Sequence, residues 1–119
     1  MRKELLSPQA FEEAVEEEIE ISSDFGLPVC ALVLRLPSEP DPGLIRRLLD
    51  DLRLADLAAI TASGELALVL PNTSRETARA VGERLLSGAP PDATLRVAGY
   101  ETGDTPATLL DRARHAEPF

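Results

Sequence analysis

Arg53 and Asp56 stand three positions apart, and five residues then separate them from a turn that carries a single acid, Glu65. A guanidinium can bind phosphate or stack on a planar ring, and a carboxylate can accept hydrogen bonds from the N–H groups of such a ring. Acids gathered at a turn can also hold divalent metal ions. The stretch 53–74 therefore raises two questions: whether the turn is a metal site, and whether the Arg–Asp pair binds a ligand.

Each of these features also has a purely structural interpretation. Arg-x-x-Asp occurs a second time in the chain, at Arg47 and Asp50. On a helix, such an i, i+3 pair is a surface salt bridge that contributes roughly 0.2–0.5 kcal/mol. Glu65 opens an apolar strand after a hairpin, where we expect a solvated turn carboxylate in preference to a metal ligand.

The elements that must position these residues follow from apolar runs separated by turn residues. Ser7 and Pro8 begin a helix whose other face is acidic, and Gly26 and Pro28 end it. The run 29–36 is short and almost continuously apolar, which indicates a central strand. The further segments are a loop at 37–43, a helix over 44–54, strands at 56–61 and 65–71 joined by 62–64, a helix capped by Thr73 or Ser74, a strand at 93–101 and a last helix at 107–117 after Thr105 and Pro106.

This order is a helix, then β-α-β-β-α-β, then a helix. It predicts an α+β fold with a ferredoxin-like core, in which a four-stranded antiparallel sheet has the core helices on one face. The strands 29–36 and 65–71 would be the central pair, because both are too apolar for a sheet edge. The N- and C-terminal helices flank this core.

Composition excludes several classes of protein. The length of 119 residues predicts one domain, 1–119, and an apolar content of 44% predicts a packed core. Cys30 is the only cysteine, which excludes an internal disulfide and a thiolate metal cage. A net charge of −9 argues against nucleic acids and anionic membranes as partners. We expect a cytoplasmic protein, since no apolar run is long enough for a membrane span or a signal peptide.

The ordered set of these segments resembles the GGDEF domains of diguanylate cyclases. The resemblance rests on Arg53-Leu-Ala-Asp56, five residues, "ASGEL" at 62–66, the strand "ALVLPNTS", the helix segment "AVGERL" and the end "LRVAGYETGDTPATLLDRARHA". It covers nearly the whole chain and implies a nucleotide-cyclase-like fold in a bacterial signalling protein.

Departures from the family pattern concern the catalytic residues. In the family, two glycines of the hairpin approach the nucleotide, and acids hold two magnesium ions for phosphoryl transfer. The corresponding hairpin residues here form a degenerate motif turn. The family also has an Asp at the end of the first core strand, and this position is Arg35 here. The family's guanine-binding Asn and Asp and its late Lys have no counterpart. The resemblance therefore implies an inactive domain, with no enzymatic activity, no cofactor and no metal. The residues of the degenerate motif turn are Ala62, Ser63, Gly64, Glu65 and Leu66.

A second family site has counterparts in this chain. The resemblance implies that Arg53, Asp56 and Arg84 correspond to the site at which cyclic di-GMP inhibits the family's enzymes. Besides a ferredoxin-like regulatory domain that binds a metabolite, for which the sequence has no motif, two functions remain open at this point. One is an inactive signalling domain with cyclic di-GMP as its ligand, and the other is a module of the same fold that binds a protein partner or a second copy of itself without any nucleotide.

Overall fold

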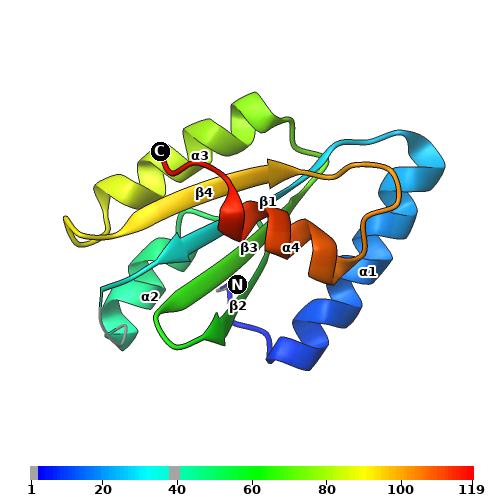
Figure 1. Cartoon of the computed structure of the whole chain (residues 1–119). Helices are drawn as coiled ribbons and strands as arrows, with labels where there is room; N and C mark the ends of the chain where they lie inside the picture. The colour runs from blue at the N-terminus through cyan, green and yellow to red at the C-terminus, as the bar shows by residue number, and fades with distance from the viewer. Residues whose placement is uncertain (1–2, 38–40) are drawn as a thin grey trace.

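The computed structural model describes residues 3–37 and 41–119, and these residues form four helices and four strands (Figure 1). Part of the predicted loop at 37–43 lies outside the described residues. No described helix is long and apolar enough to span a membrane. In chain order the elements are α1 (Pro8–Phe25), β1 (Val29–Arg35), α2 (Pro42–Leu49), β2 (Leu57–Ala62), β3 (Glu65–Pro71), α3 (Arg75–Ser87), β4 (Thr94–Gly99) and α4 (Pro106–His115).

The four strands form one antiparallel sheet in the order β2-β3-β1-β4. The register of β1 on β3 runs from Val29 opposite Pro71 to Arg35 opposite Glu65. Every residue of β3 is buried, as expected for an interior strand covered on both faces. The prediction that β1 and β3 form the central pair is confirmed.

The two faces of the sheet carry different side chains, because successive residues of a strand point to opposite faces. One face is rich in leucine and packs against α2 and α3. The other face has small residues on the sheet and packs against α1 and α4 (Figure 1). The predicted α+β class with a ferredoxin-like core is confirmed, and the flanking helices cover the second face. The leucines are Leu32, Leu34, Leu66, Leu68 and Leu70, and the small residues are Ala31, Ala59, Ala67 and Ala98.

Hydroxyl side chains cap three of the helices. The Oγ of Ser7 accepts from the backbone N–H of Ala10 at the start of α1, and Ser74 caps α3 in the same way. Thr105 caps α4 and exchanges a second hydrogen bond with Thr108. These caps satisfy N–H groups that have no partner within the helix. The sequence located all three, with Ser74 rather than Thr73 as the cap of α3.

The predicted helix over 44–54 is too long, because α2 ends at Leu49. The next residues form tight turns in which Asp51 N–H donates to Leu48 O and Leu52 N–H donates to Leu49 O. Aspartates at 50 and 51 disfavour continuation, since negative charge is unfavourable at a helix C-terminus. Arg53 therefore lies in the connection between α2 and β2, not at the end of the helix.

The hairpin between β2 and β3 has a two-residue turn, Ser63 and Gly64, rather than the predicted three. Gly64 has φ +71°, and a Cβ on it would lie 2.9 Å from the carbonyl oxygen of Leu36. Its own carbonyl accepts the Leu36 N–H at 2.7 Å. Glycine is thus required here for backbone conformation and for the close approach of the chain that leaves β1.

Terminal segments lie along both outer strands of the sheet. On β2, the N–H of Leu6 donates to Ala58 O at 2.8 Å. On β4, the N–H of Phe119 donates to Leu95 O at 2.9 Å. Unpaired edge strands present free N–H and C=O groups to other chains, so these contacts protect the edges.

Charge is distributed unevenly between the two helical layers. α1 contains seven acids and no lysine or arginine. α2 and α3 on the opposite face together contain five arginines and two glutamates. The net charge of −9 is therefore not spread evenly over the molecule.

Candidate functional site

The turn acid is buried in an ion cluster. Glu65 is the first residue of β3, and only 1% of it is exposed. Arg114 of α4 donates from Nε to Oε1 at 3.0 Å and from Nη2 to Oε2 at 3.0 Å. Arg35, directly opposite in the register, donates from Nη2 to Oε1 at 3.2 Å, and the hydroxyl of Thr61 donates to Oε2. The expectation of a solvated turn carboxylate is wrong.

Opposing effects set the ionisation of this carboxylate. Burial by itself raises the pKa of Glu65, because a charge is disfavoured away from water. The hydrogen bonds from Arg114 and Thr61 and the charges of Arg114 and Arg35 outweigh burial, so the pKa is lowered. The hydrogen bond to Glu65 in turn raises the pKa of Arg114. The cluster holds one negative and two positive charges at neutral pH.

This cluster is unsuited to a divalent cation. Magnesium requires near-octahedral coordination by oxygen, whereas both Glu65 oxygens already accept hydrogen bonds from cations. Within 3–37 and 41–119, no three His, Cys, Asp or Glu side chains are grouped so that they could hold a metal ion. The structure thus places two guanidiniums beside the only acid of the turn.

Sequence reasoning identified Arg35 but missed Arg114. Arg35 is the last residue of β1, and the pairing of β1 with β3 places it opposite Glu65. Arg114 lies 49 residues after Glu65 on α4, so only the packing of α4 onto the sheet brings the two together. No local pattern in the sequence indicates this contact.

The Arg53–Asp56 pair connects two segments of the chain. The Asp56 side chain is 3% exposed; its Oδ2 accepts the Arg53 backbone N–H at 2.7 Å, and its Oδ1 accepts Arg53 Nη2 at 2.8 Å. The same Nη2 donates to Pro71 O at 2.8 Å and to Thr73 Oγ1 at 2.7 Å. Arg53 therefore ties the connection before β2 to the loop after β3.

These contacts change both interpretations of the motif. The pair is not a helical surface salt bridge, because α2 has ended and Asp56 is buried. Nor is the carboxylate free to accept from a ligand, as a guanine contact by Asp56 requires. The second copy, Arg47 and Asp50, forms no ion pair in the part of the chain that the structure describes.

All three predicted ligand residues nevertheless line one pocket. Arg53, Asp56 and Arg84 surround a hollow of about 140 Å³ between the α2–β2 connection and α3. The Arg53 side chain is 55% exposed, and Arg84 is exposed as well. Ligand pockets generally measure roughly 300–1,000 Å³, so this hollow would hold part of a ligand rather than all of it. The other lining residues are Asp51, Leu70, Thr73, Thr77 and Val81.

Comparisons with known proteins give matches at the level of structure. No protein-family model matches the chain, and no curated protein matches its sequence. The solved GGDEF domain of TpbB (YfiN) from Pseudomonas aeruginosa is similar, with a TM-score of 0.79 and 22% identity over 92% of this chain and 80% of that one. The GGDEF domain of DgcB from Caulobacter crescentus, solved in complex with c-di-GMP, gives a TM-score of 0.76 and 14% identity over 93% and 80%.

A third similar structure contains a protein partner. Diguanylate cyclase SiaD from Pseudomonas aeruginosa, in complex with its activator SiaC, gives a TM-score of 0.81 and 22% identity over 94% of this chain and 53% of that one. At such identities the similarity concerns the fold. The chain has the fold of GGDEF diguanylate cyclase domains, and the predicted resemblance is confirmed at that level.

Proposed function

We propose that residues 1–119 form a GGDEF-like signalling domain that does not make cyclic di-GMP and acts in the bacterial cytoplasm through binding. The observation that carries this proposal is the Glu65 cluster. Arg35 and Arg114 occupy both oxygens of the acid that would have to bind magnesium. Phosphoryl transfer needs metal ions to neutralise charge on the triphosphate, and this turn supplies no second acid.

Incubation of the purified chain with GTP and either Mg²⁺ or Mn²⁺ tests the loss of activity. We expect no cyclic di-GMP by chromatography and no pyrophosphate release. Arg35→Asp alone should not restore turnover, because the glycines of the turn and the guanine-binding residues are still missing. Synthesis of cyclic di-GMP by the unmodified chain would contradict the proposal.

Cyclic di-GMP is the ligand that we propose for the hollow beside Arg53. Support comes from the convergence of Arg53, Asp56 and Arg84 on one pocket and from the GGDEF domain of DgcB, solved with c-di-GMP. Asp56 acts here as a positioning residue that holds Arg53, while the two guanidiniums supply the contacts to phosphate or guanine. Calorimetry with cyclic di-GMP on the purified chain tests this directly.

A module that binds a protein partner or a second copy is the other candidate. The internal use of the Asp56 carboxylate and the small size of the hollow favour it, and SiaD was solved with a protein activator. The two candidates separate on one measurement. Heat or a raised melting temperature with excess cyclic di-GMP supports the ligand, whereas neither signal leaves the protein-binding module as the function.

A further inference from the structure

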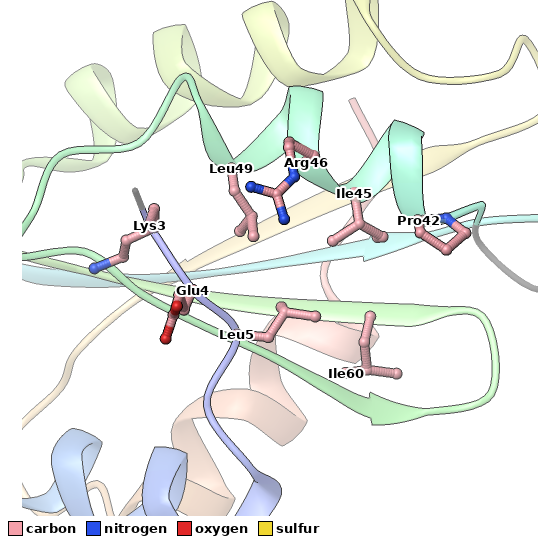
Figure 2. A pocket seen from close by; sticks show the side chains of 8 residues that line it. All are labelled: Lys3, Glu4, Leu5, Pro42, Ile45, Arg46, Leu49 and Ile60. Atoms are coloured by element: carbon pink, nitrogen blue, oxygen red, sulfur yellow. The ribbon is translucent and has the colours of Figure 1, made fainter. Parts of the chain in front are cut away.

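A larger pocket, of about 370 Å³, lies between the N-terminal segment, α2 and β2 (Figure 2). It shares no lining residue with the hollow beside Arg53 and contains no member of the Glu65 cluster. Its volume falls within the range of small-molecule sites, roughly 300–1,000 Å³. The lining residues are Lys3, Glu4, Leu5, Pro42, Ile45, Arg46, Leu49 and Ile60.

The walls of this pocket are mainly apolar. Ile45 and Leu49 project from α2 toward the N-terminal segment, and Leu5 and Ile60 lie on the opposite side (Figure 2). Leu5 is 38% exposed, whereas Ile45 and Leu49 are 7% and 6% exposed. An apolar group that enters the pocket would therefore remove mainly Leu5 and the half-buried Ile60 from water, which favours binding, and it would pack against the already buried Ile45 and Leu49.

Arg46 supplies a cation to this apolar pocket. Its guanidinium lies beside Leu49, on the side of α2 that carries Ile45 and Leu49 (Figure 2). Arg46 forms no ion pair within residues 3–37 and 41–119. It can therefore donate two parallel hydrogen bonds to a carboxylate or a phosphate.

The other two charged residues do not compete for this role. The Lys3 ammonium donates to Leu54 O at 2.6 Å, away from the apolar side chains. The Glu4 carboxylate points away from α2 (Figure 2). The pocket thus combines an apolar wall with a cation on one side.

We propose that this pocket binds a small amphipathic anion, with its apolar body between α2 and β2 and its carboxylate or phosphate on Arg46. The proposal goes beyond the signalling function and does not depend on it, because the two pockets share no residue. The chemistry favours one small anionic head group on an alkyl or aryl body. A highly charged polar ligand would leave most of the apolar wall unused.

Calorimetry on the purified chain tests the proposal with three probes of equal chain length: octanoate, octyl phosphate and octanol, each below its micelle or solubility limit. We expect saturable binding of at least one of the anions and binding of octanol that is weaker by roughly tenfold, because octanol lacks the charge-assisted contact. Binding of octanoate alone assigns a carboxylate as the head group, and binding of octyl phosphate alone assigns a phosphate.

Matched variants assign the binding to this pocket. Arg46→Gln should lower the affinity for the two anions by roughly tenfold and leave the affinity for octanol unchanged. Arg47→Gln, on the same helix but outside the pocket, should change nothing. Leu5→Ser should weaken all three probes, since it removes part of the apolar wall. Circular dichroism melting of each variant confirms folding.

Three results would overturn the proposal. They are the absence of saturable heat with both anions, equal affinity for octanol and the anions, and equal losses for Arg46→Gln and Arg47→Gln in variants that remain folded. Each would mean that the pocket has no anion specificity.

Discussion

Glu65 is held by charged hydrogen bonds from two distant elements. Arg114 contributes three hydrogen bonds to the buried carboxylate, two of them from Nε, and Arg35 contributes one. Burying a charge without partners is costly, so the two arginines make the buried acid tolerable. At this scale the cluster is both the reason for the proposed loss of catalysis and a contribution to the stability of the fold.

Arg114→Met should destabilise the chain strongly, although the Arg114 side chain is one-third exposed. Breaking a buried ion pair costs roughly 3–5 kcal/mol, and we expect the lower end because Arg35 still reaches the carboxylate. Urea unfolding measures the change in the free energy of unfolding. Arg47→Met, an exposed arginine on α2, is the matched control and should change stability by less than about 0.5 kcal/mol. Equal effects of the two variants would contradict the assignment.

The pH dependence of stability should reflect the lowered pKa of Glu65. A folded-state pKa below that of the unfolded chain contributes stability that is fully present above the unfolded value, about 4.3 for glutamate, and is lost as the pH falls through the folded value. Urea unfolding between pH 7 and 3 should show this decline. Glu65→Gln removes this titration, so its stability should decline less steeply; part of the decline remains, because Arg112 also keeps the pKa of Asp104 low.

Arg84→Ala gives the cleanest test of the cyclic di-GMP site. Among the described residues Arg84 forms no ion pair, whereas Arg53 is tied to Asp56, Pro71 and Thr73 and its removal would disturb the fold. If cyclic di-GMP binds, loss of one charged contact should cost on the order of 1.5–3 kcal/mol, roughly ten- to a hundredfold in Kd. Arg47→Ala should bind as the unmodified chain does. Unchanged affinity of Arg84→Ala would exclude this site.

Sequence alone located most of these residues but not their environments. The resemblance to GGDEF domains implied that Arg53, Asp56 and Arg84 share one site, and they line one pocket. The burial of Asp56 and Glu65 was not predictable, since it depends on how the connection before β2 and helix α4 pack on the sheet. Side-chain partners 18 and 49 residues away leave no local pattern.

At the scale of elements, the two faces of the sheet should respond differently to changes in side-chain size. Leu68 and Ala67 are neighbours in β3, both fully buried, and they point into different layers. Leu68→Ala should leave a cavity against α2 and α3 and cost roughly 2–5 kcal/mol. Ala67→Leu should overpack against α1 and α4 and cost roughly 1–3 kcal/mol.

Urea unfolding of the pair checks this expectation, with Ala80→Ser on the exposed side of α3 as a control. An unchanged free energy of unfolding for Ala67→Leu would mean that α1 and α4 can move away from the sheet. A neutral Leu68→Ala would contradict tight packing under α2 and α3.

Helix boundaries were predictable where a side chain sets them and not elsewhere. Ser7, Ser74 and Thr105 mark the starts of α1, α3 and α4, because a hydroxyl cap is a local interaction. The end of α2 was placed five residues too far, at Leu54 instead of Leu49. Apolar spacing continues past Leu49, but the tight turns and the Asp56–Arg53 hydrogen bond take the chain out of the helix.

At the scale of the whole molecule, strand order was the most predictable feature. Each of the two continuous apolar runs is too apolar for a sheet edge, and the observed order β2-β3-β1-β4 has both strands inside. The sequence did not predict that segments near the two ends lie along the outer strands. Leu6 and Phe119 make these contacts through backbone hydrogen bonds, which leave no trace in the pattern of side chains.

The segregation of acids on α1 and arginines on α2 and α3 gives the molecule an electric dipole across the sheet. The molecule measures 38 × 31 × 22 Å, and the Debye length is about 30 Å in 0.01 M salt but about 10 Å in 0.1 M salt. In dilute salt, one molecule can therefore orient another, with the acidic helix of one against the arginines of the next. Association between molecules should then depend on their orientation, as for a dipole, rather than be uniformly repulsive as for a negative sphere. Added salt should abolish this long-range attraction between molecules before it weakens ion pairs in direct contact.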